Sequence, residues 1–247
     1  MNEIQALQRD IFKNYSRDLG LDTNAKYLHG TPLKPVVPLD TGTGSLFILG
    51  AYPSARFALI NRISDVPVAD NLGPFESERW FDGSRVRKQP SARELEELFL
   101  NPLSVAREKC WITDLVKVFL FKKGHIRRYK KLNAVEPAGY VRERFFDLGE
   151  QSISWIEKEL MVARPTFVIT LGAEVAGILR GVRSAPVQSK LLVPNVSELV
   201  IGSVSVPSMH CSHPGILMRN DPNNPWPLRH KKEFIPALMS AKLKYGF

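Results

Sequence analysis

The sequence predicts an α/β fold: a three-layer sandwich around a central, mostly parallel four-stranded sheet. Four short apolar runs have the character of buried strands, and helical segments lie between them. Strands that are apolar on both faces are typical of a parallel sheet with helices on each side. A length of 247 residues with 44% hydrophobic content suits one domain with a full core.

The first part of the chain predicts a helix, a loop and a strand. Asn2–Leu19 places Leu7 and Ile11 on one apolar face at helical spacing. The segment Gly30–Gly44 is rich in Pro and Gly and leads into the apolar strand Leu46–Leu49. We therefore expect a single domain over residues 1–247, with an N-terminal helical extension at about 1–44.

The remaining elements alternate between helices and strands. A helix at about Ser91–Leu100 begins with a Ser91-x-x-Glu94 capping box, and a buried strand Cys110–Phe121 follows. One or two helices in Glu136–Met161 precede a strand Phe167–Gly172 and a helix Ala173–Leu179. The last elements are a strand Leu199–Val206, with the apolar run Val204–Met209 leading to His213, and a closing helix Lys231–Lys244.

The charge of the chain favours a polyanionic partner. The formal net charge is +9, and basic side chains gain free energy on phosphates through counterion release. The charges cluster, because Lys122–Lys131 and Arg229–Lys232 are both rich in Lys and Arg. A solvated surface loop also explains such a cluster, so the charge alone leaves both interpretations open.

Several classes of protein do not fit the sequence. No apolar run approaches the ~20 residues that span a bilayer, and the first residues do not resemble a signal peptide. Cys110 and Cys211 are too few for a disulfide framework or a Cys-only metal site. His210 and Cys211 would point to opposite faces of a strand, which argues against zinc near His213. We expect no metal, no cofactor and no membrane, and a monomer in the cytoplasm, associated with the nucleoid.

Distinctive residues follow all four predicted parallel strands. They are Gly50-Ala51-Tyr52-Pro53, Asp114 with the basic residues that follow it in the chain, Gly172-Ala173 and His213-Pro214. Ligands of such sheets bind at the carboxyl ends of the strands. We therefore expect these loops to form one site.

The motifs in these loops resemble the uracil-DNA glycosylase superfamily. The Gly-x-x-Pro loop Gly50–Pro53 and the His-Pro-x-x-Leu-x-Arg loop His213–Arg219 are similar to the two loops that carry the chemistry there. Trp111–Val118 resembles the Tyr-Ile-Thr-Asn-Val-Val-Lys-Cys strand of the thermophile-type, iron–sulfur-containing branch, and Val168–Gly172 resembles its later strand. Its Phe-x-Gly segment has two competing matches, Phe81-Asp82-Gly83 and Gly73-Pro74-Phe75.

The resemblance implies a DNA glycosylase that extrudes uracil or another deaminated or damaged base and hydrolyses its N-glycosidic bond. His213 would donate a hydrogen bond to the leaving base, and Leu217 would fill the space left in the base stack. Phe75, Trp80 or Phe81 would stack on the extruded ring. The other expected substrate contacts are Gly50, Tyr52, Pro53 and Asp114, and the expected DNA contacts, single- or double-stranded, are Lys122, Lys123, Arg127, Arg128, Leu217 and Arg219.

The first departure from the superfamily concerns the residue that positions water. Ala51 and Tyr52 stand where the superfamily usually has Asp, Asn or Glu. One branch with an apolar residue there recruits an acidic or amide group further down the loop. Asp70 and Asn71 are the candidates for this role, with Asn61 and Asp82 as reserves, and we predict that Asp70 fills it. Each residue also suits a turn or a helix cap.

Two further departures concern substrate and cofactor. Asp114 stands where the related strand has a base-reading Asn, and an ionised carboxylate only accepts hydrogen bonds. Either the substrate is not plain uracil or burial keeps Asp114 neutral. Val118 occupies a cluster-cysteine position, so the resemblance is to a member without iron–sulfur cysteines. The alternative function is an inactive member that only binds nucleic acid or a free base. A nucleotide enzyme of another α/β family has less support, because no Walker or Rossmann glycine loop is present.

Overall fold

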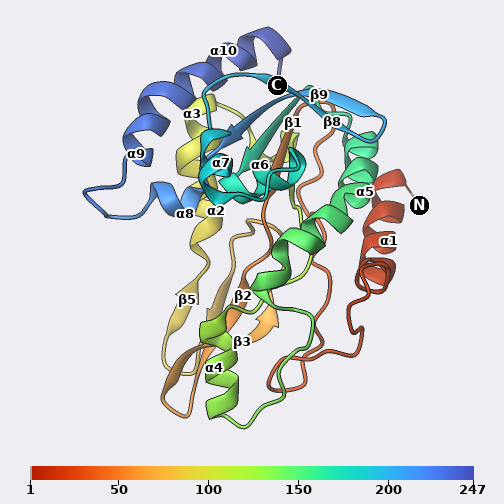
Figure 1. The fold of residues 1–247 in the computed structure, drawn as a ribbon, viewed down its shortest axis with the longest axis vertical. Coiled ribbons are helices and arrows are strands. Elements are labelled where there is room, and N and C mark those ends of the chain that lie inside the picture. Colours follow the sequence, from red (N-terminus) through yellow and green to blue (C-terminus); the bar gives the residue numbers. More distant parts are fainter. Residues whose placement is uncertain (1) are drawn as a thin grey trace.

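The computed structural model describes residues 2–247 and contains a central sheet flanked by helices (Figure 1). The sheet has five strands, one more than the four predicted, in the order β6-β1-β7-β9-β8. The first four are parallel, as predicted, and β8 pairs antiparallel with β9 at one edge. The strands are β1 (Leu46–Gly50), β6 (Cys110–Asp114), β7 (Phe167–Leu171), β8 (Ser197–Ile201) and β9 (Val204–Cys211).

Two hydrophobic cores separate the layers of the sandwich. Phe47 and Leu49 of β1 pack with α1 (Glu3–Asp18) and α5 (Phe145–Ala163) on one face. Ile48 packs with the helices of the other face, which include α3 (Asn101–Leu103) and α10 (Ile235–Tyr245). Successive side chains of a strand point to opposite faces, so the fully apolar β1 serves both cores.

The other elements are short. They are the hairpin β2 (Ala55–Ile60) and β3 (Ile63–Asp70), the hairpin β4 (Arg79–Phe81) and β5 (Val86–Lys88), and the helices α2 (Pro90–Leu95), α4 (Lys123–Lys131), α6 (Ala173–Leu179), α7 (Ala185–Lys190), α8 (Pro214–Leu217) and α9 (Trp226–Arg229).

The basic run of the sequence forms a helix, not a surface loop. Lys123–Lys131 is α4, and it contacts β3. Figure 1 shows α4 with β2, β3 and β5 at the end of the molecule opposite to α10. The chain enters this end after β1 and after β6, so the hairpins and α4 lie beyond the carboxyl ends of those strands.

Three sequence-based boundaries were wrong for identifiable reasons. The strand predicted at Cys110–Phe121 ends at Asp114, because its partner strand β1 ends at Gly50. Only the N–H groups of Leu115 and Val116 continue the bonding, to the carbonyls of Gly50 and Ala51. The helix predicted from Glu136 begins at Phe145, since the chain before it makes a turn at Ala138–Gly139 and a bridge between Val141 and Phe121. The strand Leu199–Val206 is the hairpin of β8 and β9, which turns at Gly202 with a φ of 55°.

Two helices also differ from prediction. Ser91 does not cap a helix, because α2 begins at Pro90 and Gln89 occupies the N-cap position without a side-chain bond. The helix continues through a π-helical turn, Glu96–Leu100. The closing helix has a similar π-helical turn at His230–Phe234 between α9 and α10. No helix within residues 2–247 has the length and apolar character to cross a bilayer.

Candidate functional site

The ends of β1 and β6 bring three predicted substrate residues together. Gly50 is in register with Asp114 in the parallel pair of β1 and β6. A Cβ atom at Gly50 would collide with Oδ1 of Asp114 and with the ring of Phe75. Glycine at this position therefore lets a carboxyl group and an aromatic ring meet over the strand end.

His213 completes the group from the other half of the sheet. It follows β9, and its ring centroid lies 6.5 Å from that of Phe75. Its Cβ is 3.8 Å from the position that a Cβ on Gly172, after β7, would take. Loops from β1, β6, β7 and β9 thus converge where the strand order reverses, the usual ligand position of such sheets. We call Gly50, Phe75, Asp114 and His213 the strand-end site.

His213 is held as a neutral hydrogen-bond donor. Its Nδ1 accepts the backbone N–H of Gly215 at 3.0 Å, so in the neutral ring the proton is on Nε2. Burial, with the positive charges of Lys122 and Arg219, lowers the pKa of His213 to about 4. At neutral pH the imidazole is uncharged and has one N–H available.

Asp114 is a buried carboxyl group with a raised pKa. Burial raises the pKa of Asp114 to about 7, against the opposing effect of Lys117, while Glu159 raises it further. Its side chain makes no hydrogen bond within residues 2–247, so both oxygens remain available to a ligand. Near neutral pH the group therefore exists in both its acid and its carboxylate forms.

A buried ion pair beneath Asp114 was not predicted. Lys117 and Glu159 are fully buried and form an ion pair. The Nζ of Lys117 also donates to Oγ1 of Thr113 and to the main-chain oxygen of Asp114, both at 2.6 Å. These bonds fix the end of β6. A lysine within the otherwise apolar run after Asp114 is the signal that sequence reasoning missed.

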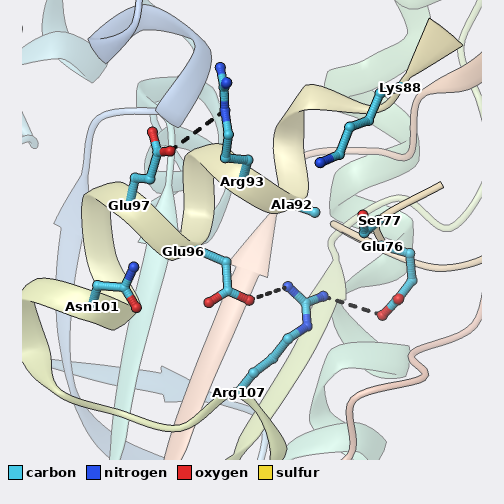
Figure 2. Close-up of a pocket in the computed structure, with 9 residues that line it drawn as sticks. All are labelled: Glu76, Ser77, Lys88, Ala92, Arg93, Glu96, Glu97, Asn101 and Arg107. Carbon is cyan, nitrogen blue, oxygen red and sulfur yellow. Dashed lines mark hydrogen bonds and ion pairs between the residues drawn. The ribbon is translucent and has the colours of Figure 1, made fainter. Parts of the chain in front are cut away.

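Phe75 has an unusual backbone that a neighbouring arginine supports. Its φ is 56°, which is rare for a bulky side chain. Arg107 donates from Nη2 to the carbonyl oxygen of Phe75 at 2.9 Å. Figure 2 shows the same guanidinium between Glu96 and Glu76, and it also pairs with Asp40 at 2.7 Å. Arg107 therefore helps to hold Phe75 in the orientation that turns its ring toward Gly50.

The cavity drawn in Figure 2 has a volume of about 500 Å³. Its charged groups largely neutralise one another. Arg93 lies 3.7 Å from Glu97, and Arg107 lies 3.5 Å from Glu96. We assign this cavity a supporting role behind Phe75 and no ligand.

Tyr52 and Pro53 form part of the wall after β1. The ring of Tyr52 lies 5.5 Å from that of Phe145, and the guanidinium of Arg142 lies 5.3 Å from the Tyr52 ring. Burial raises the pKa of the Tyr52 phenol, which therefore stays protonated. Pro53 is buried. Tyr52 can line the site, but a protonated phenol is a poor base.

Asp70 lies at the end of β3 and binds the N-terminal extension. Its Oδ1 accepts the hydroxyl of Tyr27 at 2.6 Å, and its Oδ2 accepts the N–H of Lys34 at 3.0 Å. Burial raises the pKa of Asp70 to about 6. Among the described residues, no hydrogen bond joins Asp70 to Phe75, Asp114 or His213. Its predicted role in positioning water stays a prediction.

Two other predicted residues lie in different surroundings. Phe81 is 67% exposed on β4, and no aromatic pair joins it to Phe75 or His213 among the described residues. Leu217 is only 5% exposed, packed in the core at the end of α8. The exposed apolar residue beside it is Met218.

The predicted DNA-contacting cations lie on α4 and after α8. Lys122, Lys123, Arg127 and Arg219 are exposed, and Arg128 donates to the carbonyl of Ser64 at 2.9 Å. Lys122 and Arg219 are close enough to His213 to lower its pKa. Positive charge therefore borders the strand-end site from two elements.

Both ring nitrogens of the neighbouring His210 have partners within the protein. Its Nδ1 lies 2.7 Å from Oγ1 of Thr170, and Arg180 donates to its Nε2 at 3.1 Å. Within residues 2–247, no three His, Cys, Asp or Glu side chains are grouped as metal ligands.

Comparison with known proteins does not assign a family to the chain. No protein-family model matches the sequence, and no curated protein matches it significantly.

Proposed function

We propose that this protein is a DNA glycosylase similar to the uracil-DNA glycosylase superfamily, which hydrolyses the N-glycosidic bond of uracil or another deaminated base. The observation that carries the proposal is the convergence of Phe75, Asp114 and His213 around Gly50. An aromatic ring, a carboxyl group that reads hydrogen bonds and a neutral donor are the groups that a flipped base requires.

His213 acts on the leaving base. As the bond between C1′ and the base nitrogen breaks, the bonding electrons move onto the base, and negative charge develops on its carbonyl oxygen. The Nε2–H of His213 donates to that oxygen. Water bonds to C1′ through its oxygen, and the proton that it loses neutralises the departing base anion. A positioned donor of this kind contributes about 3 kcal/mol to transition-state stabilisation.

Asp114 reads the edge of the base. In its acid form the carboxyl group donates one hydrogen bond and accepts another, as an Asn amide does. This pattern complements the adjacent carbonyl and N–H of uracil. The raised pKa of Asp114, about 7, supports this acid form at neutral pH.

The proposed partner is DNA, bound by a monomer in the cytoplasm at the nucleoid. Lys122, Arg127 and Arg219 would contact phosphates, which positions a strand without reading its sequence. These cations are exposed, and Lys122 and Arg219 lie close enough to His213 to lower its pKa. Both observations support phosphate contacts beside the strand-end site.

The test is incubation with oligonucleotides that contain one uracil, hypoxanthine or xanthine, followed by alkali. We expect strand scission at the modified position and none in the unmodified control. Scission that persists unchanged in His213→Ala would show that another site or a contaminant is responsible.

A second candidate function is binding without hydrolysis. It is favoured by the loop residues Ala51 and Tyr52, neither of which can act as a carboxylate base, and by the hydrogen bonds that occupy Asp70. Tight binding of a uracil-containing strand with no scission under any condition would select this function.

A further inference from the structure

A second cleft lies between α4 and the two hairpins, beside the loop that follows β1. Its volume is about 450 Å³, and Ser54, four residues after Gly50, lies on its rim. None of its lining residues belongs to the strand-end site. The residues that line this cleft include Phe57, Trp80, Lys88, Gln89, His125 and Arg128.

One wall of this cleft is aromatic. The rings of Phe57 and His125 lie 5.4 Å apart, and the indole of Trp80 donates to the carbonyl of Phe57 at 2.8 Å. The Nδ1 of His125 accepts the N–H of Lys122 at 3.2 Å, and burial lowers the pKa of His125 to about 4. The neutral imidazole stacks on Phe119 and supports the Phe57 ring. The Trp80 and Phe57 rings, which line the cleft, offer flat surfaces on which a base can stack.

The side-chain amide of Gln89 also lines the cleft and has no partner within the described residues. Gln89 is only 5% exposed, and its side chain makes no hydrogen bond within residues 2–247. The Gln89 amide atoms are not fully shielded from solvent, so they face the open cleft. Gln188 offers a contrast in the same chain, because its equally buried side chain donates to the carbonyl of Val182 at 2.9 Å. The amide of Gln89 therefore presents both a donor and an acceptor to a ligand in the cleft.

The rim of the cleft is positive. Arg87 is neutralised by Asp65 and Asp82. Lys88 and Arg128 form no ion pair among the residues that the structure describes, and Lys88 is exposed. Two uncompensated cations beside an aromatic wall suit a ligand that combines a flat ring with a phosphate.

We propose that this cleft binds an unpaired nucleotide of a single strand, next to the nucleotide held in the strand-end site. The base stacks on Trp80 and Phe57, and the amide of Gln89 bonds its edge. Lys88 and Arg128 contact its phosphates. The proposal rests on the proposed function only in taking DNA as the polymer, because this binding requires neither a damaged base nor excision.

The experiment compares two single-stranded oligonucleotides of equal length without damaged bases. One carries normal bases, and the other carries abasic tetrahydrofuran residues with the same phosphates. Tryptophan fluorescence and anisotropy are followed during titration. We expect the base-containing strand to quench fluorescence and to bind about 10-fold more tightly than the abasic strand, because stacking and edge contacts are lost in the latter. The quenching should disappear in Trp80→Phe.

Gln89→Leu is the decisive variant, and Gln188→Leu is its control. Gln89→Leu should remove most of the advantage of the base-containing strand and leave the affinity for the abasic strand unchanged. It should not lower the melting temperature, because no internal hydrogen bond is lost, whereas Gln188→Leu should lower the melting temperature and keep the base preference. Lys88→Met, at an exposed position, should weaken binding of both strands equally.

Equal affinity for the two strands, or a full base preference in Gln89→Leu, would overturn the inference. The proposed glycosylase function fails separately: a protein that shows the base preference and the Trp80 quenching, but releases no modified base, retains the cleft and loses the activity.

Discussion

Two buried residues set the protonation state of the strand-end site. His213 loses its positive charge above a pH of about 4, and Asp114 keeps its proton up to a pH of about 7. Between these values the site contains a neutral donor and a neutral acid. The ionised form of Asp114 would not suit this base, because a carboxylate repels developing negative charge and cannot donate to a carbonyl oxygen.

Replacement of His213 should affect chemistry more than folding. We expect His213→Ala to reduce single-turnover excision by ~100-fold or more with little change in DNA affinity, because the donor acts mainly in the transition state. His210→Ala is the matched control, since it removes a bonded structural imidazole and should lower the melting temperature instead. Normal excision by a less stable His213→Ala protein would assign His213 a structural role.

The pH dependence of excision should report Asp114. If the acid form reads uracil, the rate of uracil excision falls as the pH rises through about 7. Asp114→Asn should retain excision of uracil and lose this alkaline limb, because an amide donates and accepts at every pH. A pH profile that is identical in the variant would contradict the assignment.

The same group makes the stability depend on pH in a defined direction. The pKa of Asp114 is raised in the folded state, from 3.8 to about 7, so the folded protein binds the proton more tightly than the unfolded chain. This contribution is complete below a pH of about 4 and is lost as the pH rises through about 7.

Asp70 is tested by comparison with Asp65. We predict that Asp70→Asn lowers excision far more than stability if Asp70 positions water, whereas Asp65→Asn changes excision little. The hydrogen bonds to Tyr27 and Lys34 give the opposite expectation, a loss of stability with a proportionate loss of activity. Measuring excision and the melting temperature of both variants separates these roles.

The sequence predicted those residues of the strand-end site that lie at the end of an apolar strand. Gly50, Asp114 and His213 each follow an apolar run, and parallel strands bring their ends to one edge. Phe75 came from the family resemblance, as did Leu217, which lies in the core. Arg107 and Gln89 could not be predicted, because their roles depend on contacts between segments without regular periodicity.

The basic helix α4 is the element that should dominate DNA affinity. Replacing Lys122 and Arg127 with Ala should reduce the slope of log affinity against log salt by about two, since each phosphate contact contributes close to one counterion. Lys190 and Lys244, exposed on α7 and α10, provide a control pair whose replacement should leave the slope unchanged. Figure 1 shows α10 at the end of the molecule opposite to α4. Equal slopes for the two pairs of variants would indicate that DNA does not contact α4.

Elements with a strong apolar period were predictable, and half-buried hairpins were not. β1, β7 and α1 lie within a residue or two of prediction, because their apolar spacing is uninterrupted. β2 to β5 were missed, since their residues are mostly polar or only partly buried. Their pairing depends on packing against α4 and the N-terminal extension, which no local pattern encodes.

For the whole molecule, Tyr15 joins the N-terminal helix to the segment after β6 and to α5. Its hydroxyl accepts the N–H of Lys117 at 2.9 Å and lies 2.6 Å from Oγ of Ser152 on α5. Tyr15→Phe would leave the buried N–H of Lys117 unpaired, so we expect the free energy of unfolding to fall by about 1–3 kcal/mol. Tyr245→Phe, at a partly exposed ring, should change it little in the same denaturant titration. Equal losses in both would argue against this link.

The strand order has a consequence for the kinetics of folding. His213 enters the site only when β9 joins β7, whereas Gly50 and Asp114 meet when β1 pairs with β6. A partly folded chain can therefore hold the carboxyl side of the pocket without its imidazole. In a refolding experiment, the proposed excision would recover with the docking of β9. The fluorescence of Trp111 on β6 would report an independent event, the pairing of β6 with β1.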